Sequence, residues 1–221
     1  MDRMTLCAAA TLLIAAAVQP ATADDTSVCF QATGDEAIAA CTRVLAYNPN
    51  DVGAYVMRAT AYGRKGEYDR AISDYDQAIR LEPAADAEGG GLIYAARGGF
   101  YSLKGDYDRA IADYDRSIRL DPKVARAYRL RGIAFKHKGD YDHAIADANE
   151  AIRLDPKFAV AYVTRGEAYE AKNDPDHAIA DFDQALKFEP SLVGARQGRE
   201  RVQGLLARRS NPGAETNASP R

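Results

Sequence analysis

The sequence has little of the chemistry that most enzymes and metalloproteins use. It contains no tryptophan, three cysteines and three histidines. A zinc site needs three or four ligands with supporting hydrogen bonds, whereas only His143 and His177 occupy equivalent positions, beside a few carboxylates. No Ser-His-Asp arrangement or phosphate-binding loop is recognisable. We therefore expect a protein that is not an enzyme, with no catalytic residue, metal or cofactor. A metal-dependent hydrolase using His143 and His177 is the least favoured alternative.

The sequence also lacks a strong charge of either sign and a long apolar run. Its 29 basic and 32 acidic residues give a net charge of −3, which argues against a nucleic-acid partner because such partners require a strong basic field. The apolar run from Ala8 to Val18 has eleven residues, too few to span a membrane. It follows Arg3 and precedes Ala21-Thr22-Ala23. This pattern predicts a signal peptide, residues 1–23, cleaved after Ala23, and export to the periplasm or the medium.

Two cysteines, Cys29 and Cys41, remain after this predicted cleavage. An even number of cysteines in an oxidising compartment favours a disulfide bond between them. Their spacing is far from the Cys-x-x-Cys of redox-active pairs. Two free thiols in the core are the alternative.

What the sequence has in abundance is repetition. The segment GDYDRAIADYDRSIRLDP at 105–122 returns at 139–156 as GDYDHAIADANEAIRLDP, and proline recurs at positions 49, 83, 122, 156 and 190. The intervals between these prolines are 34, 39, 34 and 34 residues. Each of the four full units predicts two helices, because aromatic and small residues recur at helical spacing. In the first helices we expect these columns to form the core: Tyr55, Ala59, Tyr62; Tyr94, Gly98, Tyr101; Tyr128, Gly132, Phe135; Tyr162, Gly166, Tyr169.

The turns within the units carry consistent signals. Gly66, Gly105, Gly139 and Asn173 stand where the first helix should end in the left-handed conformation. The next residue is an aspartate in three units (Asp106, Asp140 and Asp174) and predicts the N-cap of the second helix. The recurring proline then ends that helix.

The 34-residue period, the helix–turn–helix unit and the closing proline resemble the tetratricopeptide repeat, with tyrosine where that family often has tryptophan. The resemblance implies an all-α solenoid of helix–turn–helix repeats, a right-handed superhelix with a C-terminal capping helix. The expected parts are, in order, a degenerate N-terminal half-repeat at 24–51, repeats at 52–85, 91–124, 125–158 and 159–190, the capping helix at 191–209 and a disordered tail at 210–221. Val193, Val202, Leu205 and Leu206 are expected to cover the last repeat.

Two charged columns recur in register. Arginine precedes the small residue of each first helix, and aspartate recurs on each second helix: Arg58, Arg97, Arg131, Arg165 and Asp74, Asp113, Asp147, Asp181. We predict ion pairs between the helices. We expect these pairs to be partly exposed, each contributing about 0–1 kcal/mol to stability, and prefer this to a functional role for them.

The resemblance also implies that the first helices line a concave face that binds a partner. The residues expected there combine small, apolar and cationic side chains: Met57, Thr60, Ala96, Gly99, Arg126, Arg129, Leu130, Ile133 and Lys136. Such a surface suits an unidentified protein or peptide with an apolar anchor and an acidic residue. Family members that clamp a C-terminal carboxylate use Lys and Asn here, and this chain has no such Asn. We therefore expect a scaffold of the cell envelope, with a structural or self-assembling envelope component, a homo-oligomer, as the alternative.

Overall fold

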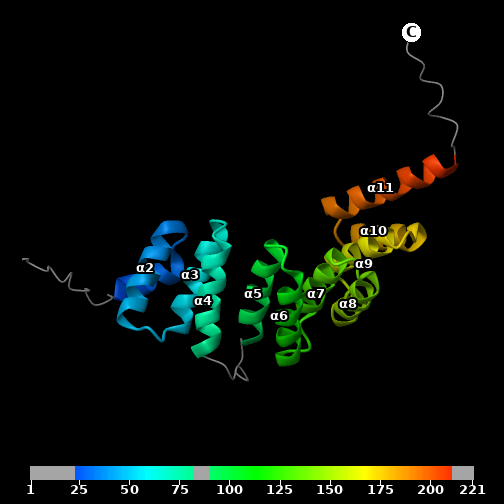
Figure 1. Ribbon diagram of the computed structural model, residues 1–221. Helices are drawn as coiled ribbons and strands as arrows, with labels where there is room; N and C mark the ends of the chain where they lie inside the picture. The colour runs from blue at the N-terminus through cyan, green and yellow to red at the C-terminus, as the bar shows by residue number, and fades with distance from the viewer. Residues whose placement is uncertain (1–22, 82–89, 211–221) are drawn as a thin grey trace, which may run out of the picture.

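The computed structural model describes residues 23–81 and 90–210 (Figure 1). All but one residue of the predicted signal peptide, most of the predicted tail and residues 82–89 lie outside the described residues. Within the described ranges the chain forms eleven helices and no strand. They are α1 (Ala23–Gln31), α2 (Gly34–Tyr47), α3 (Val52–Arg64), α4 (Tyr68–Leu81), α5 (Gly90–Leu103), α6 (Tyr107–Leu120), α7 (Ala125–His137), α8 (Tyr141–Leu154), α9 (Ala159–Ala171), α10 (Pro175–Phe188) and α11 (Val193–Ser210).

Consecutive helices pack as pairs, and the pairs follow one another in a single row (Figure 1). The prediction of an all-α helix–turn–helix solenoid is confirmed. The N-terminal unit, predicted as a half-repeat, consists of two helices, of which α1 is the shorter. In the part of the chain that the structure describes, no helix is long and apolar enough to cross a membrane.

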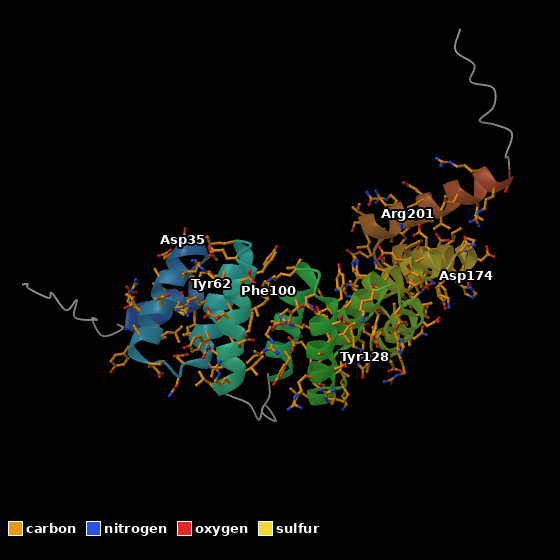
Figure 2. All side chains as sticks on the ribbon, in the orientation of Figure 1. Asp35, Tyr62, Phe100, Tyr128, Asp174 and Arg201 are labelled. Atoms are coloured by element: carbon orange, nitrogen blue, oxygen red, sulfur yellow. A yellow bond between two sulfur atoms is a disulfide. The ribbon has the colours of Figure 1, made fainter. Side chains whose placement is uncertain are left out.

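The turns inside the repeats have the predicted conformations. Gly66, Gly105 and Gly139 have φ values of 79°, 79° and 81°, and Asn173 has a φ of 63°. The following aspartate caps the second helix in three repeats. For example, Asp174, labelled in Figure 2, accepts a hydrogen bond of 3.3 Å from the His177 N–H. These caps satisfy backbone donors that the helix itself leaves unpaired.

The small residues of the first helices are buried where two helices approach closely. An added Cβ at Gly132 would lie 3.1 Å from the Ala144 carbonyl oxygen and 3.2 Å from the Asp147 Cβ. The aromatic columns of the first helices differ from the prediction, because their rings are half-buried. The fully buried large rings come instead from second helices, such as Tyr114 and Phe182.

An arginine stacks on the first tyrosine of each column. The tyrosine that begins each column lies under the guanidinium of the arginine three residues later, with the guanidinium carbon 5.5 to 5.7 Å from the ring centre. The pairs are Tyr55–Arg58, Tyr94–Arg97, Tyr128–Arg131 and Tyr162–Arg165. Each ring thus packs against a polar partner that keeps contact with solvent.

The four arginines pair with the four aspartates as predicted, and we call this set (Arg58–Asp74, Arg97–Asp113, Arg131–Asp147 and Arg165–Asp181) the arginine–aspartate ladder. Each pair has two hydrogen bonds of 2.6 to 2.9 Å. The expectation of partly exposed pairs is wrong for the aspartates, whose side chains are only 7–8% exposed. The ladder is therefore a set of largely buried, bidentate ion pairs.

Each ladder arginine also reaches back to the preceding helix pair. Its third nitrogen donates to a residue of the previous second helix: Arg58 to Thr42, Arg97 to Asp76, Arg131 to Asp115 and Arg165 to Asn149. Arg199 of α11 continues the series with Asp183, at 3.0 Å. The ladder thus joins each repeat to the one before it.

The capping helix α11 covers α10 through a narrower set of residues than predicted. Ala195, Gly198 and Val202 are buried, and an added Cβ at Gly198 would lie 2.5 Å from the Phe182 ring. Val193 and Leu205 are 57% and 46% exposed, so their predicted covering role is wrong. Val193 lies outside the helical face that Ala195, Gly198 and Val202 define, whereas Leu205 lies on that face but beyond the last buried residue, Val202.

The outer side of α11 shows why the row of helices ends there. The positions that follow Tyr162, Gly166 and Tyr169 by 34 residues are Arg196, Glu200 and Gln203, and all three are exposed. The aromatic and small residues that would pack against another second helix are thus replaced by polar ones. A polar outer face is what a terminal unit of a repeat array requires.

The structure contains a disulfide bond between Cys29 and Cys41. It joins α1 to α2, and both cysteines are buried together with Ala40 and Val44. The bond therefore lies in the one unit whose first helix is short.

Candidate functional site

Two hollows of the described surface lie between the first helices α5 and α7. The first cavity has a volume of about 610 Å³ and is lined by Leu92, Val124 and Ala127 among others. The second cavity has a volume of about 490 Å³ and is lined by Phe100, Ile133 and His137 among others. Both cavities share Ala95, Ala96, Arg126 and Leu130. They therefore form one continuous hollow, which we call the α5–α7 groove.

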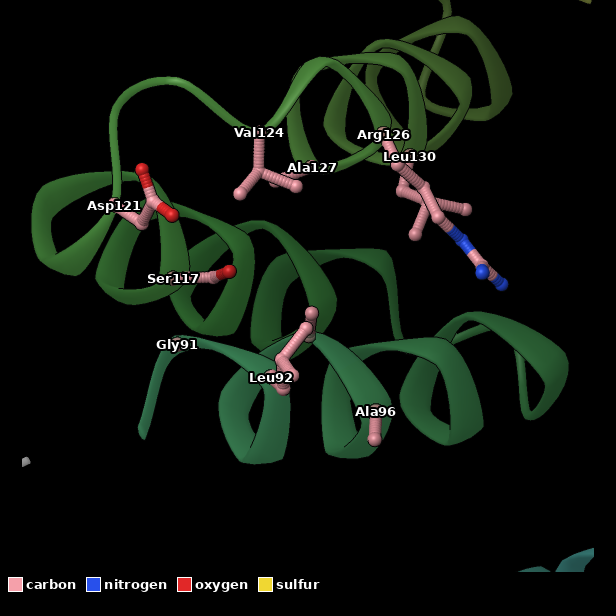
Figure 3. A pocket seen from close by; sticks show the side chains of 10 residues that line it. Gly91, Leu92, Ala96, Ser117, Asp121, Val124, Arg126, Ala127 and Leu130 are labelled. Atoms are coloured by element: carbon pink, nitrogen blue, oxygen red, sulfur yellow. The ribbon is translucent and has the colours of Figure 1, made fainter. Parts of the chain in front are cut away.

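Small residues keep the α5–α7 groove open. Ala95, Ala96 and Gly99 supply its α5 wall, and an added Cβ at Gly99 would meet only the Tyr114 hydroxyl, at 4.0 Å. Leu130 lies opposite on α7. Figure 3 shows Leu92 and Val124 pointing toward each other across the first cavity.

Two exposed leucines stand at the two ends of this groove. Leu92 lines the first cavity and is 66% exposed, and Leu103 lines the second and is 63% exposed. Contiguous exposed apolar surface of this kind is typical of binding sites.

Hydroxyl groups interrupt the apolar lining. The Tyr114 and Ser102 hydroxyls lie 3.4 Å apart beside the second cavity. Ser117 lines the first cavity from α6, and Figure 3 shows its hydroxyl directed into it. Burial raises the pKa of Tyr114, and the positive charges of Arg129 and Arg126 oppose that rise. Tyr114 therefore stays protonated at neutral pH.

Two arginines concentrate positive charge at the middle of the groove. Arg126 lines both cavities, and Figure 3 shows it extending from α7 past Leu130. Arg129 stacks over the Phe158 ring, with its guanidinium carbon 5.7 Å from the ring centre. Its buried Nε makes no hydrogen bond, and burial and the nearby Arg126 lower its pKa. Among the described residues, no carboxylate forms an ion pair with either arginine.

The structure brings together part of the predicted concave-face set. Ala96, Gly99, Arg126, Leu130 and Ile133 line the α5–α7 groove, and Arg129 lies beside it.

The other three predicted residues lie elsewhere. Lys136 forms an ion pair with Glu167 of α9 and lines a separate hollow. Met57 packs against the buried cluster around the disulfide. Thr60 reaches the groove only through Tyr75, whose hydroxyl lies 3.2 Å from its own.

The sequence pattern also places Leu103 on the groove face. Sequence reasoning missed Leu92 and Phe100 of α5, Tyr114 and Ser117 of α6, and Val124, which precedes α7. A signal for Leu92 was present, because Leu92, Ala96, Gly99 and Leu103 follow one face of a helix.

The histidines at equivalent positions have a structural role. The Nδ1 atoms of His143 and His177 lie 2.7 Å from the capping aspartates Asp140 and Asp174. Their rings stack on Phe135 and Tyr169. Across the described ranges, no group of three or more His, Cys, Asp or Glu side chains is placed to hold a metal ion.

The row of helix pairs and its apolar groove define a helical-repeat scaffold. Models of the tetratricopeptide repeat match residues 52–84, 104–159 and 159–192, together more than half of the chain. The chain belongs to the tetratricopeptide repeat family, whose members are generally non-catalytic modules of protein interaction. A search of curated proteins gave no match.

Solved structures of the same family resemble this one. A crystal structure of MamA is 29% identical over 71% of this chain and 88% of its own, with a TM-score of 0.64. The first repeat domain of Spaghetti (RPAP3), bound to the HSP90 peptide SRMEEVD, is 26% identical over 55% of this chain and 96% of its own, with a TM-score of 0.53. YrrB is 20% identical over 75% of this chain and 83% of its own, with a TM-score of 0.63, and supports the fold alone.

Proposed function

We propose that this protein is a non-enzymatic scaffold of the cell envelope that binds a segment of a partner protein in the α5–α7 groove. The observation that carries the proposal is the continuous apolar groove with an exposed leucine at each end. Burying such surface against a partner is favourable by about 25 cal/mol per Å² of apolar area. A related repeat domain bound to an HSP90 peptide supports a peptide as the occupant.

The mode of binding differs from a carboxylate clamp. The α5 wall offers Ala95, Ala96 and Gly99, none of which can bind a carboxylate through a side chain. Affinity comes instead from apolar contacts at Leu130 and from charge at Arg126. The absence of a clamp stays a prediction.

A displayed library of random peptides tests the groove directly. Selected peptides should bind the wild-type protein and lose at least about tenfold in affinity with Leu130→Asp, because a carboxylate would then replace the apolar side chain that the ligand contacts. Leu205→Asp adds the same charge on α11, outside the groove, and should leave affinity unchanged. Peptides that bind both variants equally well would contradict the assignment.

Export is the second part of the proposal. The pattern of residues 1–23 supports it, and so does the pairing of Cys29 with Cys41, since disulfides persist mainly in oxidising compartments. In a bacterial host the full chain should appear in the periplasmic fraction with a new N-terminus at Asp24. A cytoplasmic product that retains Met1 would contradict export. Light scattering separates this scaffold from the self-assembling alternative, because a strict monomer excludes the latter.

A further inference from the structure

The α5–α7 groove contains two apolar cavities with positive charge between them. Arg126 and Leu130 line both cavities, so they mark the boundary between the first cavity and the second. The two cavities also differ in character. The first is lined by aliphatic side chains such as Leu92 and Val124, whereas aromatic rings such as Phe100 line the second.

The aromatic wall of the second cavity includes a stacked pair. His137 and Tyr107 have ring centroids 5.0 Å apart and an interplanar angle of 4°. Tyr75 stacks on Phe100 with centroids 5.8 Å apart. Flat, rigid walls of this kind favour a flat aromatic side chain of the ligand, since aromatic pairs gain energy beyond their buried area.

The separation of the cavities along α7 limits the conformation of the occupant. Ala127 of the first cavity and Ile133 of the second are six residues apart, or about 9 Å along the helix axis. A chain in the extended polyproline II conformation covers that distance in about three residues and returns to the same face after three. A helical ligand needs about six residues for the same distance.

The polar groups of the groove also favour an extended ligand. An extended backbone exposes N–H and C=O groups that need partners, whereas a helix satisfies its own. The hydroxyls of Ser102, Tyr114 and Ser117 face the groove from α5 and α6. The hydroxyl of the half-buried Ser102 is placed to hydrogen-bond to such a backbone, whereas Tyr114 and Ser117 are only 1% and 4% exposed.

The arginines complete the pattern that the ligand must match. Arg126 and Arg129 are three residues apart on α7, so their like charges repel each other. The buried Nε of Arg129 makes no hydrogen bond. The nearest charged partner of Arg129 on α9, Glu167, already pairs with Lys136. A carboxylate of the ligand beside Arg126 would relieve this repulsion and accept hydrogen bonds from the Arg126 guanidinium, which lines both cavities.

We propose, as a refinement that rests on the proposed function, that the α5–α7 groove binds an extended segment in which an acidic residue lies between two apolar residues about three positions apart. The aliphatic residue occupies the first cavity, the aromatic residue occupies the second, and the carboxylate lies against Arg126 and Arg129. Recognition thus depends on the side chains of an internal segment and does not require a chain terminus.

Because the protein has no tryptophan, a peptide that carries one is a specific fluorescence probe. The probes are short peptides with blocked ends, each containing one leucine, one glutamate and one tryptophan, with the spacing between leucine and tryptophan varied. Affinity should be highest when these two residues are about three positions apart. Replacing the glutamate of the best peptide by glutamine should weaken binding about tenfold, and high salt should reduce that difference.

Two variants of the protein locate the contacts. Arg126→Gln should bind the glutamate and glutamine peptides with affinities within about twofold of each other. Arg119→Gln, an exposed arginine on α6, removes the same charge and should preserve the preference. Gly99→Leu should fill the second cavity and weaken the binding of tryptophan-containing peptides about tenfold. It should leave the helix intact, because an added Cβ at this position has space and leucine favours helices.

The outcomes separate this inference from the function on which it rests. Equal affinity for the glutamate and glutamine peptides, or an optimum at about seven positions, overturns the inference. If no probe binds but library peptides that depend on Leu130 are recovered, the inference fails and the proposed function stands. If neither experiment yields a ligand of the groove, both fail.

Discussion

The substitution Arg131→Ala tests how the repeats are held together. Arg131 donates to both oxygens of Asp147, at 2.9 and 2.6 Å, and its third nitrogen donates to Asp115 of the preceding repeat. The hydrogen bonds to Asp147 raise the pKa of Arg131 well above its ordinary value, so it remains charged at every pH of interest. Removing its side chain leaves a carboxylate without its cation.

The burial of Asp147 sets the size of the effect. Its side chain is 7% exposed, while that of Arg131 is 21% exposed. Removing one partner of a buried ion pair costs about 3–5 kcal/mol, whereas loss of an exposed pair costs about 0–1 kcal/mol. Water that reaches the site of the missing arginine will reduce the penalty, so we expect a loss of about 2–3 kcal/mol.

Urea unfolding monitored by circular dichroism measures this loss. Arg119→Ala removes an exposed arginine from the adjacent repeat and should change the unfolding free energy by less than about 0.5 kcal/mol. In the double variant with Asp147→Asn, the two losses should not add, because the substitutions remove the same interaction. A loss below about 1 kcal/mol for Arg131→Ala would refute the reasoning, because the ladder pairs would then contribute no more to stability than exposed ion pairs do.

Four further substitutions have defined outcomes. Asn149→Asp gives Arg165 a second carboxylate partner, as Arg131 has in Asp115. The unfolding free energy from urea titrations at low salt should rise by up to about 1 kcal/mol, and no gain would contradict the ladder's link between repeats. Gly139→Ala forces a side chain into a φ of 81° and should cost about 1–2 kcal/mol, and an unchanged midpoint would show that the turn relaxes. Cys29→Ser removes the disulfide and should cost about 3 kcal/mol in the chain-entropy model, with no further effect of a reductant on the variant. The pKa of Asp140 is lowered, chiefly by a hydrogen bond from the backbone N–H of His143. The ionised carboxylate therefore stabilises the fold above the unfolded carboxyl pKa of about 3.9, and this stabilisation is lost as the pH falls through the folded pKa. The Tm of Asp140→Ala should accordingly be below that of the wild type at neutral pH and equal to it in acid.

The sequence predicts the helices and turns because the residues that indicate them recur in several repeats. Gly105 and Gly139 occur at the same place in adjacent units, and only a left-handed turn explains a glycine at both. The degree of burial was harder to predict. The periodicity that marks Tyr128 as inward-facing does not show that its ring stays half-buried, with the Arg131 guanidinium packed on it.

The site was predicted only where the repeat itself determines which face a residue occupies. Gly99 and Leu130 follow from the register of the first helices. Tyr114 and Ser117 belong to a second helix, and they reach the groove because the α5 wall is made of small residues. The same register placed Met57 on the groove face, but a single repeat pattern cannot show that α1 and α2 bring their own apolar cluster against it.

The arginine–aspartate ladder and the proposed binding groove lie on different faces of α7. Leu130 and Arg131 are adjacent in the chain, so their side chains point about 100° apart around the helix axis. Leu130 lines the groove, whereas Arg131 pairs with the buried Asp147 of α8. The two functions should therefore separate in variants that still fold. Leu130→Asp should abolish peptide binding at a cost of about 1 kcal/mol in unfolding free energy, since Leu130 packs against the buried Tyr114 cluster but is itself only half-buried beside an open cavity. Arg131→Ala should lower the unfolding free energy and leave peptide affinity unchanged at temperatures where the variant is folded. If either variant loses both stability and peptide affinity, the groove and the ladder are coupled.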